Sequence, residues 1–311
     1  MIKVEHIQAS ICANTGQRID TLICEYPRAI HAQLLTHRVF SKNSSSTRAI
    51  PLHKAIEQIE ANPAEYIWTS KQAGMQGAVI TDEKLLGEIN SEFNSAMGKM
   101  IDRANYLVND LGVHKQNAGR LLEPFQNIKI VLTSTEWENW DWLRDDPAAQ
   151  GEIAELARAI SKARAEAEPM VLNEGEWHVP FVERERKESG GLRYFTSETT
   201  EVDDYVTVLT VEEAKLVSMS VCAQTSYRNA DYSLEKAIDM RGKLLDSKKV
   251  HASPSEHQSY AIDYKGVDSF VPTTWPDGIT HVDHDGALWS ANFKGFVQHR
   301  QLLKGHDKAK S

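Results

Sequence analysis

The sequence contains few cysteines and no long apolar run, and each absence excludes a class of protein. Cys12, Cys24 and Cys222 lie far apart and form no C-x-x-C pair, which indicates free thiols in a reducing compartment. No apolar run is as long as a membrane span. The N-terminal MIKVEHIQAS also lacks the apolar core of a signal peptide. We therefore expect a cytoplasmic protein that does not bind membranes.

Two nucleotide-binding signatures are also missing. The chain has no G-x-G-x-x-G after a strand and no G-x-x-x-x-G-K-[ST], which excludes Rossmann and P-loop sites. Its formal net charge of -9 argues against binding to a nucleic acid polymer, since such proteins normally present a basic face. A local basic pocket for a single nucleotide remains compatible with this charge.

The most informative part of the chain is a polar, cationic stretch. Residues 36–48 (THRVFSKNSSSTR) contain two arginines, a histidine, an amide and several hydroxyls, directly after an apolar helical run. Arginine binds phosphate oxygens bidentately, and hydroxyls and amides add neutral hydrogen bonds. The stretch therefore predicts a polyanion site.

Hydrophobic periodicity predicts an α+β fold, with a mixed or antiparallel sheet flanked by long helices. The polar composition near residues 185–200 predicts a boundary between a domain at 1–190 and another at 191–311. The serine-rich segment 41–46 is expected to be a loop, and the apolar stripe of helix 82–111 is expected to pack in a core. The other expected strands are 2–11, 19–26, 128–132, 205–209, 259–264 and 287–291. The other expected helices are 136–144, 148–167, 211–222, 233–245 and 294–303.

The stretch also resembles one family, the flavin-dependent thymidylate synthases (ThyX). That family carries Arg-His-Arg, seven residues, then Ser, with Asn inside the gap and Arg two positions after the Ser. The matching residues here are His37, Arg38, Asn43, Ser46 and Arg48, preceded by Pro27 and Gln33 of the family's lead-in. Thr36 stands where the first arginine is usual, and Ser44 stands where a glutamate is usual.

The resemblance extends over most of residues 19–150 and 215–300, but in an unusual order. Arg120–Pro124 resembles an Arg-x-x-Leu-Pro segment, and Asn139–Arg144 resembles a segment that ends in Leu-Arg. Two motifs that precede Arg-His-Arg in common members appear late here, as Ala223–Tyr227 and His251–His257. The sequence therefore resembles a divergent, circularly permuted and phage-like member, whose site would still form by spatial convergence.

The resemblance implies a ThyX-like fold and the reductive methylation of dUMP to dTMP. Methylene-tetrahydrofolate would supply the carbon, reduced FAD the hydride, and NADPH would reduce the flavin again. No cysteine nucleophile and no metal are implied. Family members are homotetramers whose sites draw on several subunits, so a homo-oligomer is expected, in the host cytoplasm if a phage encodes it.

The resemblance also assigns roles to residues. Arg144 is implied to be catalytic, because it would bind the uracil ring and stabilise negative charge on it while remaining protonated. The implied nucleotide-binding residues are Gln33, Ser46, Arg48, Arg120 and Arg144. The implied FAD-binding residues are His37, Arg38, Asn43, Asn139, Ser226, Ser253 and Glu256.

Several alternatives remain open. The departures at Thr36 and Ser44 allow another pyrimidine nucleotide such as dCMP, or another one-carbon outcome. Arg144 is alternatively a surface residue paired with a neighbouring aspartate at 141, 145 or 146. The tryptophans at 137, 140 and 142 either stack on a cofactor or pack in the core.

Two other classes of function are also compatible with the sequence. A metallohydrolase would use a cluster without a recognised ligand scheme, made of His251, His257, His281, Asp283, His284 and Asp285. A non-catalytic protein would retain only the nucleotide pocket.

Overall fold

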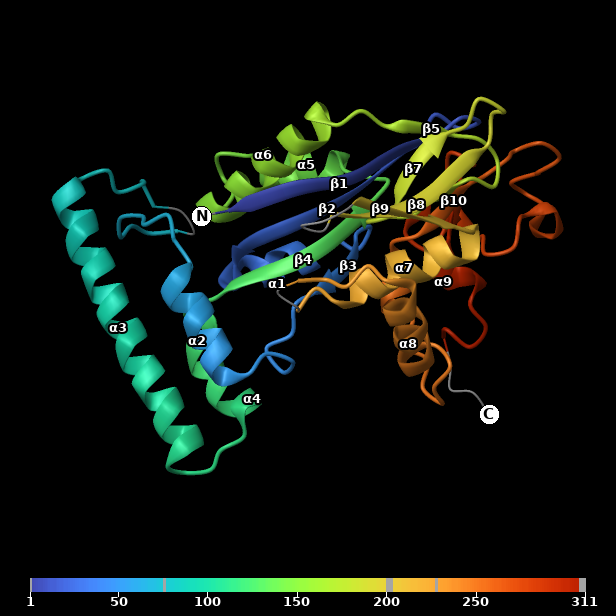
Figure 1. Ribbon diagram of the computed structural model, residues 1–311. Helices are drawn as coiled ribbons and strands as arrows, with labels where there is room; N and C mark the ends of the chain where they lie inside the picture. The colour runs from blue at the N-terminus through green and yellow to red at the C-terminus, as the bar shows by residue number, and fades with distance from the viewer. Residues whose placement is uncertain (1, 75–76, 200–203, 227–228, 308–311) are drawn as a thin grey trace.

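The two N-terminal strands predicted from the sequence lie inside a mixed five-stranded sheet (Figure 1). The computed structural model describes residues 2–74, 77–199, 204–226 and 229–307. The strand order is β3-β4-β2-β1-β5, in which only the β1–β5 pair is parallel. The predicted α+β class is therefore confirmed. The strands are β1 (Lys3–Cys12), β2 (Arg18–Pro27), β3 (Ser41–Ser44), β4 (Asn127–Ser134) and β5 (Met170–Leu172).

The loop expected at residues 41–46 is wrong for its first part, because Ser41–Ser44 form the edge strand β3. Its backbone pairs with β4 from Ser41 opposite Thr133 to Ser44 opposite Ile130. An edge strand keeps one side free for polar partners, so serine is tolerated there despite its weak strand propensity. Tertiary pairing has overridden local composition.

Two helices cover one face of the sheet, and their apolar residues form its core (Figure 1). α5 (Glu138–Arg144) and α6 (Gly151–Glu166) pack there through Trp140, Ile153 and Ile160, against Tyr26 and other residues of the sheet. Trp137 is also buried in this core, whereas Trp142 is 75% exposed. The core-packing alternative is therefore correct for the first two tryptophans.

A helical arm stands beside the sheet (Figure 1). It consists of α2 (Leu52–Ala61), α3 (Glu83–Asn109), α4 (Lys115–Ala118) and the 3-10 helix η2 (Gly119–Phe125). The long predicted helix is confirmed as α3, which Asp82 caps by accepting a hydrogen bond from the Leu85 amide at 2.8 Å.

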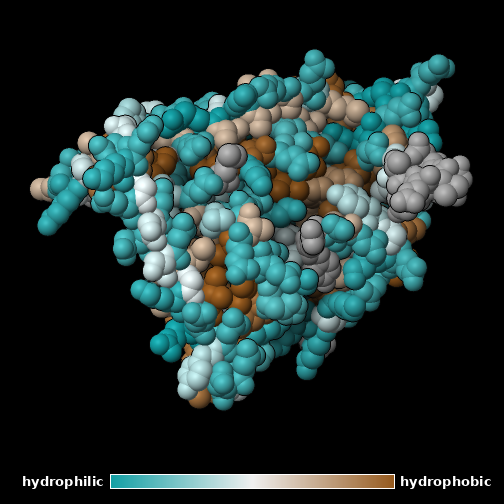
Figure 2. Space-filling model, turned by 60° about the vertical axis from the view of Figure 1, so that its left-hand side comes forward, coloured by the Kyte–Doolittle hydropathy of each residue, from teal (hydrophilic) through white to brown (hydrophobic). Residues whose placement is uncertain are grey.

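The apolar stripe of α3 is covered on one side only. Among its residues Ala104 alone is buried, against Leu122 and Phe125 of η2, while Leu85 is 43% exposed. The view that brings the arm side forward shows hydrophobic patches between hydrophilic side chains (Figure 2). The expectation that the stripe packs in a core therefore holds between Phe93 and Ala104, whose apolar side chains pack against this cluster, and is wrong at Leu85 near the start of the helix.

The C-terminal part of the chain adds three small antiparallel sheets and further helices. The predicted domain boundary falls in the turn between β7 and β8, and the division into two domains stays a prediction. The strands are β6 (Trp177–His178), β7 (Glu183–Arg186), β8 (Leu192–Thr199), β9 (Asp204–Leu209), β10 (Ser259–Ala261), β11 (His281–Val282), β12 (Leu288–Ser290), β13 (Phe293–Lys294) and β14 (Phe296–Gln298). The remaining helices are η1 (Arg28–Ile30), α1 (His31–Leu35), α7 (Val211–Ala223), α8 (Leu234–Leu244), η3 (Ser253–Glu256), η4 (Pro272–Thr274) and α9 (His299–Leu302).

The helix expected over 294–303 is wrong for most of its length. Gly295 takes a φ of +70°, and a Cβ there would lie 2.9 Å from Thr15 Oγ1. This conformation and close approach suit glycine alone, so the chain turns there between β13 and β14. Only His299–Leu302 remain helical. No helix of the four described ranges is both long and apolar enough to cross a membrane.

A chain of hydrogen bonds between buried side chains connects distant segments through the core. Ser10 Oγ lies 2.8 Å from His178 Nδ1, and His178 Nε2 lies 2.9 Å from Thr21 Oγ1. Thr21 Oγ1 lies 2.7 Å from Thr133 Oγ1, which lies 2.8 Å from His257 Nδ1. All five side chains are fully buried, so each depends on these partners for its hydrogen bonds.

Arg184 sets the direction of this chain, because a guanidinium can only donate. Its NH1 donates to Ser10 Oγ at 2.9 Å, so the Ser10 hydroxyl in turn donates to His178 Nδ1. Burial lowers the pKa of His178 well below its usual value and that of His257 to about 3, so both rings are neutral. Each hydroxyl then donates onward, which leaves the proton of both rings on Nε2.

This direction predicts the tautomer of His257, which histidine ¹⁵N NMR measures. In the unaltered protein we expect the Nε2–H form. Ser10→Ala removes the donor to His178 Nδ1, and we expect a population of the Nδ1–H form of His257 to appear. Ser220→Ala removes another buried hydroxyl, which takes no part in these hydrogen bonds, and should leave the spectrum unchanged. An Nδ1–H ring at His257 in the unaltered protein would contradict the proposed direction.

The two tryptophans of α5 predict opposite effects on stability. Trp140→Ala empties a fully buried site, and we expect the free energy of unfolding to fall by about 3–5 kcal/mol. Trp142→Ala removes an exposed ring, and we expect a change within about 0.5 kcal/mol. Urea denaturation measures both, and equal effects would show that the burial pattern of α5 is wrong.

Candidate functional site

A hollow of about 440 Å³ lies where the end of α1 meets α5. Four residues predicted for the site, far apart in sequence, line it together: His37, Arg38, Asn139 and Arg144. Thr36, Val39, Glu136, Glu138, Leu143 and Trp289 complete its wall. The fold therefore joins the cationic stretch to the predicted catalytic segment.

Arg144 is held against the end of α1 by three hydrogen bonds. Its Nε donates to His37 Nε2 at 3.0 Å, and its NH2 donates to Thr36 Oγ1 at 3.2 Å and to the Gln33 carbonyl at 3.4 Å. All three acceptors are neutral. The two N–H groups of NH1 have no partner in the described part of the chain, so they remain available to a ligand at the hollow.

The alternative that Arg144 pairs with a neighbouring aspartate is wrong. Asp141 pairs with Arg164 at 2.9 Å, and Asp145 pairs with Arg158 at 3.2 Å. Asp146 accepts a hydrogen bond from a backbone amide of the following turn. Within the described ranges, Arg144 therefore forms no ion pair, although Glu136 and Glu138 line the same hollow.

His37 remains neutral, so it orients Arg144 without adding a second charge. Its buried ring lies edge-on to Trp140, with ring centroids 4.8 Å apart, and stacks on Phe40. Burial, together with the charges of Arg144 and Lys42, lowers its pKa to about 4. Because Nε2 accepts from Arg144, the ring proton lies on Nδ1.

A second hollow, of about 380 Å³, adjoins the first because Arg38 lines both. Lys42, Glu256 and Arg300 line it too. Glu256 pairs with Arg300, and burial raises its pKa while the charges of Arg300 and Lys42 oppose that rise. Three cations around one carboxylate leave this hollow electropositive, which suits an anionic ligand.

The motifs that occur late in the sequence lie against the serine-rich stretch. Ser253 Oγ donates to Asn43 Oδ1 at 2.8 Å, and the Ser46 amide donates to Ser226 Oγ at 2.8 Å. Asn43 also donates to the Cys222 carbonyl at 3.4 Å. Four predicted residues are thus in contact as two pairs. Tyr227, in the same motif as Ser226, lies outside the described residues.

Other predicted residues do not join the two hollows. Arg48 and Arg120 are exposed and line neither of them, and Arg120 lies on η2 in the helical arm. The side-chain amide of Gln33 donates to Gln150 Oε1 at 2.5 Å, so only the backbone carbonyl of Gln33 contacts a residue of the hollow, Arg144. The predicted nucleotide-binding set is therefore not assembled within one chain.

Sequence reasoning missed two cations of the second hollow, Lys42 and Arg300. Lys42 lies inside the cationic stretch, and its charge was a usable signal. Its ammonium donates to the His37 carbonyl at 2.8 Å. Arg300 belongs to no motif, and only the reversal of the chain at Gly295 brings it to Glu256.

The cysteines and the histidine–aspartate cluster give no second candidate centre. All three cysteines are buried and free, and burial raises the pKa of the Cys24 and Cys222 thiols. In the part of the chain that the structure describes, no group of three or more His, Cys, Asp or Glu is arranged to hold a metal. Asp283 instead accepts from Trp289 Nε1 at 2.9 Å.

Three solved structures resemble this chain at low identity. A crystal structure of the UMP/dUMP methylase PolB from Streptomyces cacaoi, bound with 5-Br UMP, is 16% identical, with a TM-score of 0.43, over 53% of this chain and 90% of that one. Two structures of the flavin-dependent thymidylate synthase ThyX from Helicobacter pylori, both with FAD and dUMP, are 16% and 15% identical. Each has a TM-score of 0.32 and covers 47% of this chain and 67% of that one.

The family comparison is more specific. No curated protein matches the chain. Residues 19–170 match the model of the family described as Thy1, thymidylate synthase complementing protein. This segment contains the cationic stretch, Arg120 and Arg144. Residues 19–170 are therefore similar to the Thy1 family.

Proposed function

We propose that this protein is an FAD-dependent enzyme that methylates dUMP to dTMP, with methylene-tetrahydrofolate as carbon donor and NADPH as reductant. One observation carries the proposal: within a segment similar to the Thy1 family, the unpaired guanidinium of Arg144 lines the same hollow as Arg38. Similarity to the family supports flavin-dependent nucleotide methylation, and the exact substrate is the proposed part.

The residues of the two adjoining hollows fit the chemistry of FAD. A flavin dinucleotide carries a diphosphate, and Arg38, Lys42 and Arg300 offer three cations around the second hollow. Asn139 borders the first hollow, and Glu256 the second. In the proposal these residues hold FAD with His37, Asn43, Ser226 and Ser253. The bound flavin would supply the hydride for reduction of the transferred carbon.

Arg144 is proposed to act on the pyrimidine. Its free NH1 group is suited to the N3 and carbonyl edge of uracil, where it stabilises negative charge as the ring loses its proton. An arginine does this without changing its own protonation state. Neutral His37 and Thr36 orient the guanidinium and leave its charge available to the ring.

The nucleotide phosphate is assigned to Arg48, Arg120 and Ser46. Because both arginines lie outside the hollows of their own chain, the proposal includes a homo-oligomer, a tetramer as in the family, in which neighbouring copies complete each site. The proposal keeps the permuted order of the motifs, in which Ser226 and Ser253 of the late motifs contact the serine-rich stretch.

The proposal predicts a yellow protein that NADPH bleaches in the presence of dUMP and that forms dTMP when folate is added. Arg144→Lys removes the fork that faces the ring, and we expect kcat/KM to fall about 100-fold or more, with FAD retained. Arg158→Lys, at an exposed ion pair, is the matched control and should keep full activity. Unchanged dTMP formation by the Arg144→Lys variant would contradict the role given to Arg144.

Parallel incubation with dCMP tests the substrate. Thr36, in place of the family's arginine, accepts a hydrogen bond from Arg144, so this departure touches the residue that is proposed to bind the pyrimidine. We expect turnover of dUMP alone. Turnover of dCMP in place of dUMP would keep the flavin chemistry and replace the substrate, whereas a protein that never binds FAD would overturn the proposal as a whole.

A further inference from the structure

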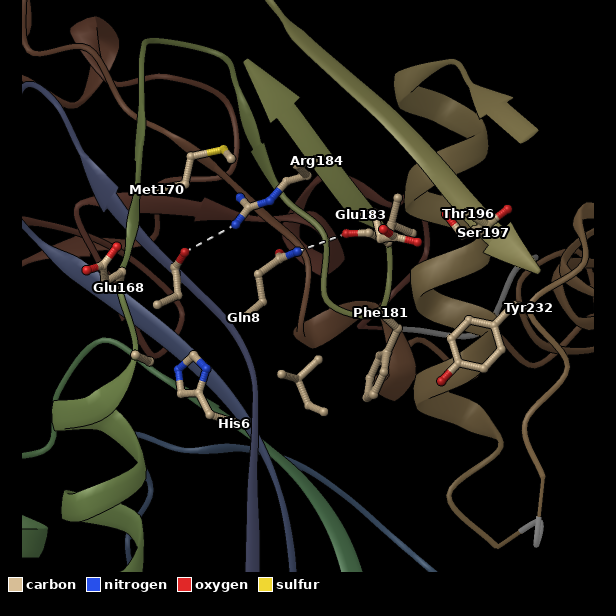
Figure 3. Close-up of a pocket in the computed structure, with 14 residues that line it drawn as sticks. His6, Gln8, Glu168, Met170, Phe181, Glu183, Arg184, Thr196, Ser197 and Tyr232 are labelled. Carbon is tan, nitrogen blue, oxygen red and sulfur yellow. Dashed lines mark hydrogen bonds between the residues drawn. The ribbon is translucent and has the colours of Figure 1, made fainter. Parts of the chain in front are cut away.

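A third hollow, of about 640 Å³, lies apart from the candidate site and shares no lining residue with it. It is enclosed by β1, the segment after α6, the β7–β8 hairpin and Tyr232, which lies just before α8 (Figure 3). Nothing in the proposed methylation uses it. Its lining combines one cation, two carboxylates and an apolar wall.

The cation is Arg184, whose guanidinium has only neutral acceptors. It donates to Ser10 Oγ at 2.9 Å, to the Ala9 carbonyl at 3.1 Å and to the Trp177 carbonyl at 3.4 Å. Across the described ranges it forms no ion pair. Burial lowers its pKa to about 10, so it stays charged near neutral pH. The nearby Glu176 carboxylate is already paired with Arg186. A partly buried cation without an ion pair of its own is unfavourable, and the unused N–H groups of Arg184 suit a carboxylate.

The apolar wall consists of Phe181, Met170 and Tyr232. Phe181 adopts a φ of +68°, a left-handed conformation that is rare for a bulky side chain. Such strain persists where surrounding structure enforces it, and it concentrates at ligand-binding sites. Figure 3 shows Met170 on one side of the hollow and the two aromatic rings on the other.

The two carboxylates belong to Glu168 and Glu183, which are both exposed. They lie on opposite sides of the hollow (Figure 3), and neither pairs with a cation of the described residues. They would repel a simple anion. A simple amine would leave the charge of Arg184 uncompensated.

We propose that this hollow binds a small zwitterion with an apolar or aromatic body, which is the chemistry of a free α-amino acid. Arg184 receives the carboxylate, and Glu168 and Glu183 attract the ammonium group. Phe181, Met170 and Tyr232 surround the apolar body. A ligand with both charges satisfies every charged group of the lining, which neither charge alone achieves.

Isothermal titration calorimetry of the full chain, without flavin or nucleotide, tests this site. The probes are L-phenylalanine, N-acetyl-L-phenylalanine, which lacks the ammonium group, and phenethylamine, which lacks the carboxylate. We expect L-phenylalanine to bind, and we expect each analogue to bind at least about tenfold more weakly. An absence of L-phenylalanine binding overturns the proposal, and so does equal binding by either analogue.

Substitutions locate the site. Phe181→Gly removes part of the wall at a φ that glycine accepts, so we expect about tenfold weaker binding of L-phenylalanine. The relief of backbone strain should offset part of the packing that Phe181 loses against the neighbouring core, so the fold is retained. Arg184→Gln should abolish binding, although it also alters the buried hydrogen-bonded chain, so the glycine variant is the safer test. Undiminished binding by the glycine variant overturns the proposal.

The carboxylates have a matched control on the same strand. Glu168→Gln combined with Glu183→Gln should weaken L-phenylalanine about tenfold and leave N-acetyl-L-phenylalanine unaffected or improved. Glu185→Gln, at an exposed residue of β7 outside the lining, should change neither. Equal effects of the double variant and of the control overturn the role of the carboxylates.

Discussion

The buried hydrogen-bonded chain from Arg184 to His257 is the constraint on which the rest of the structure depends. It runs through β1, β2, β4 and β6 and ends beside Glu256, so segments from both ends of the sequence have a fixed relation to one another. A buried polar group left without its partner costs about 1–3 kcal/mol. The alignment of these segments is therefore cooperative. Because His257 follows Glu256 in the sequence, the buried hydrogen bonds also help to fix the position of the second hollow.

The candidate site concentrates positive charge in a protein of net charge -9. It does so by orienting cations with neutral groups: a histidine and a threonine hold Arg144, and a backbone carbonyl holds Lys42. Carboxylates elsewhere neutralise most other partly buried arginines, as Asp20 does for Arg18. Charge left unpaired in this way is what a nucleotide phosphate or a developing ring anion requires.

Sequence patterns predicted the features set by local periodicity and by motif spacing. The strands at 2–11 and 19–26 and the helix at 82–111 follow from side-chain alternation and helical spacing. The motif spacing also identified His37, Arg38 and Arg144, which share a hollow. β3 and the turn at Gly295 escaped prediction, because strand pairing and a close backbone approach decide them. Arg300 depends on both long-range packing and that turn, and no local signal marks it.

The one-sided packing of α3 has a consequence for motion within the native state. α3 is 27 residues long and fully buries only Ala104, while its other apolar residues are half-buried against the short helices of the arm and not in the core of the sheet. Its backbone amides should therefore exchange with solvent through local opening at a free energy well below that of global unfolding. The arm would then fluctuate as a separate unit while the five-stranded sheet stays intact, and Arg120, at the foot of the arm, would move with it.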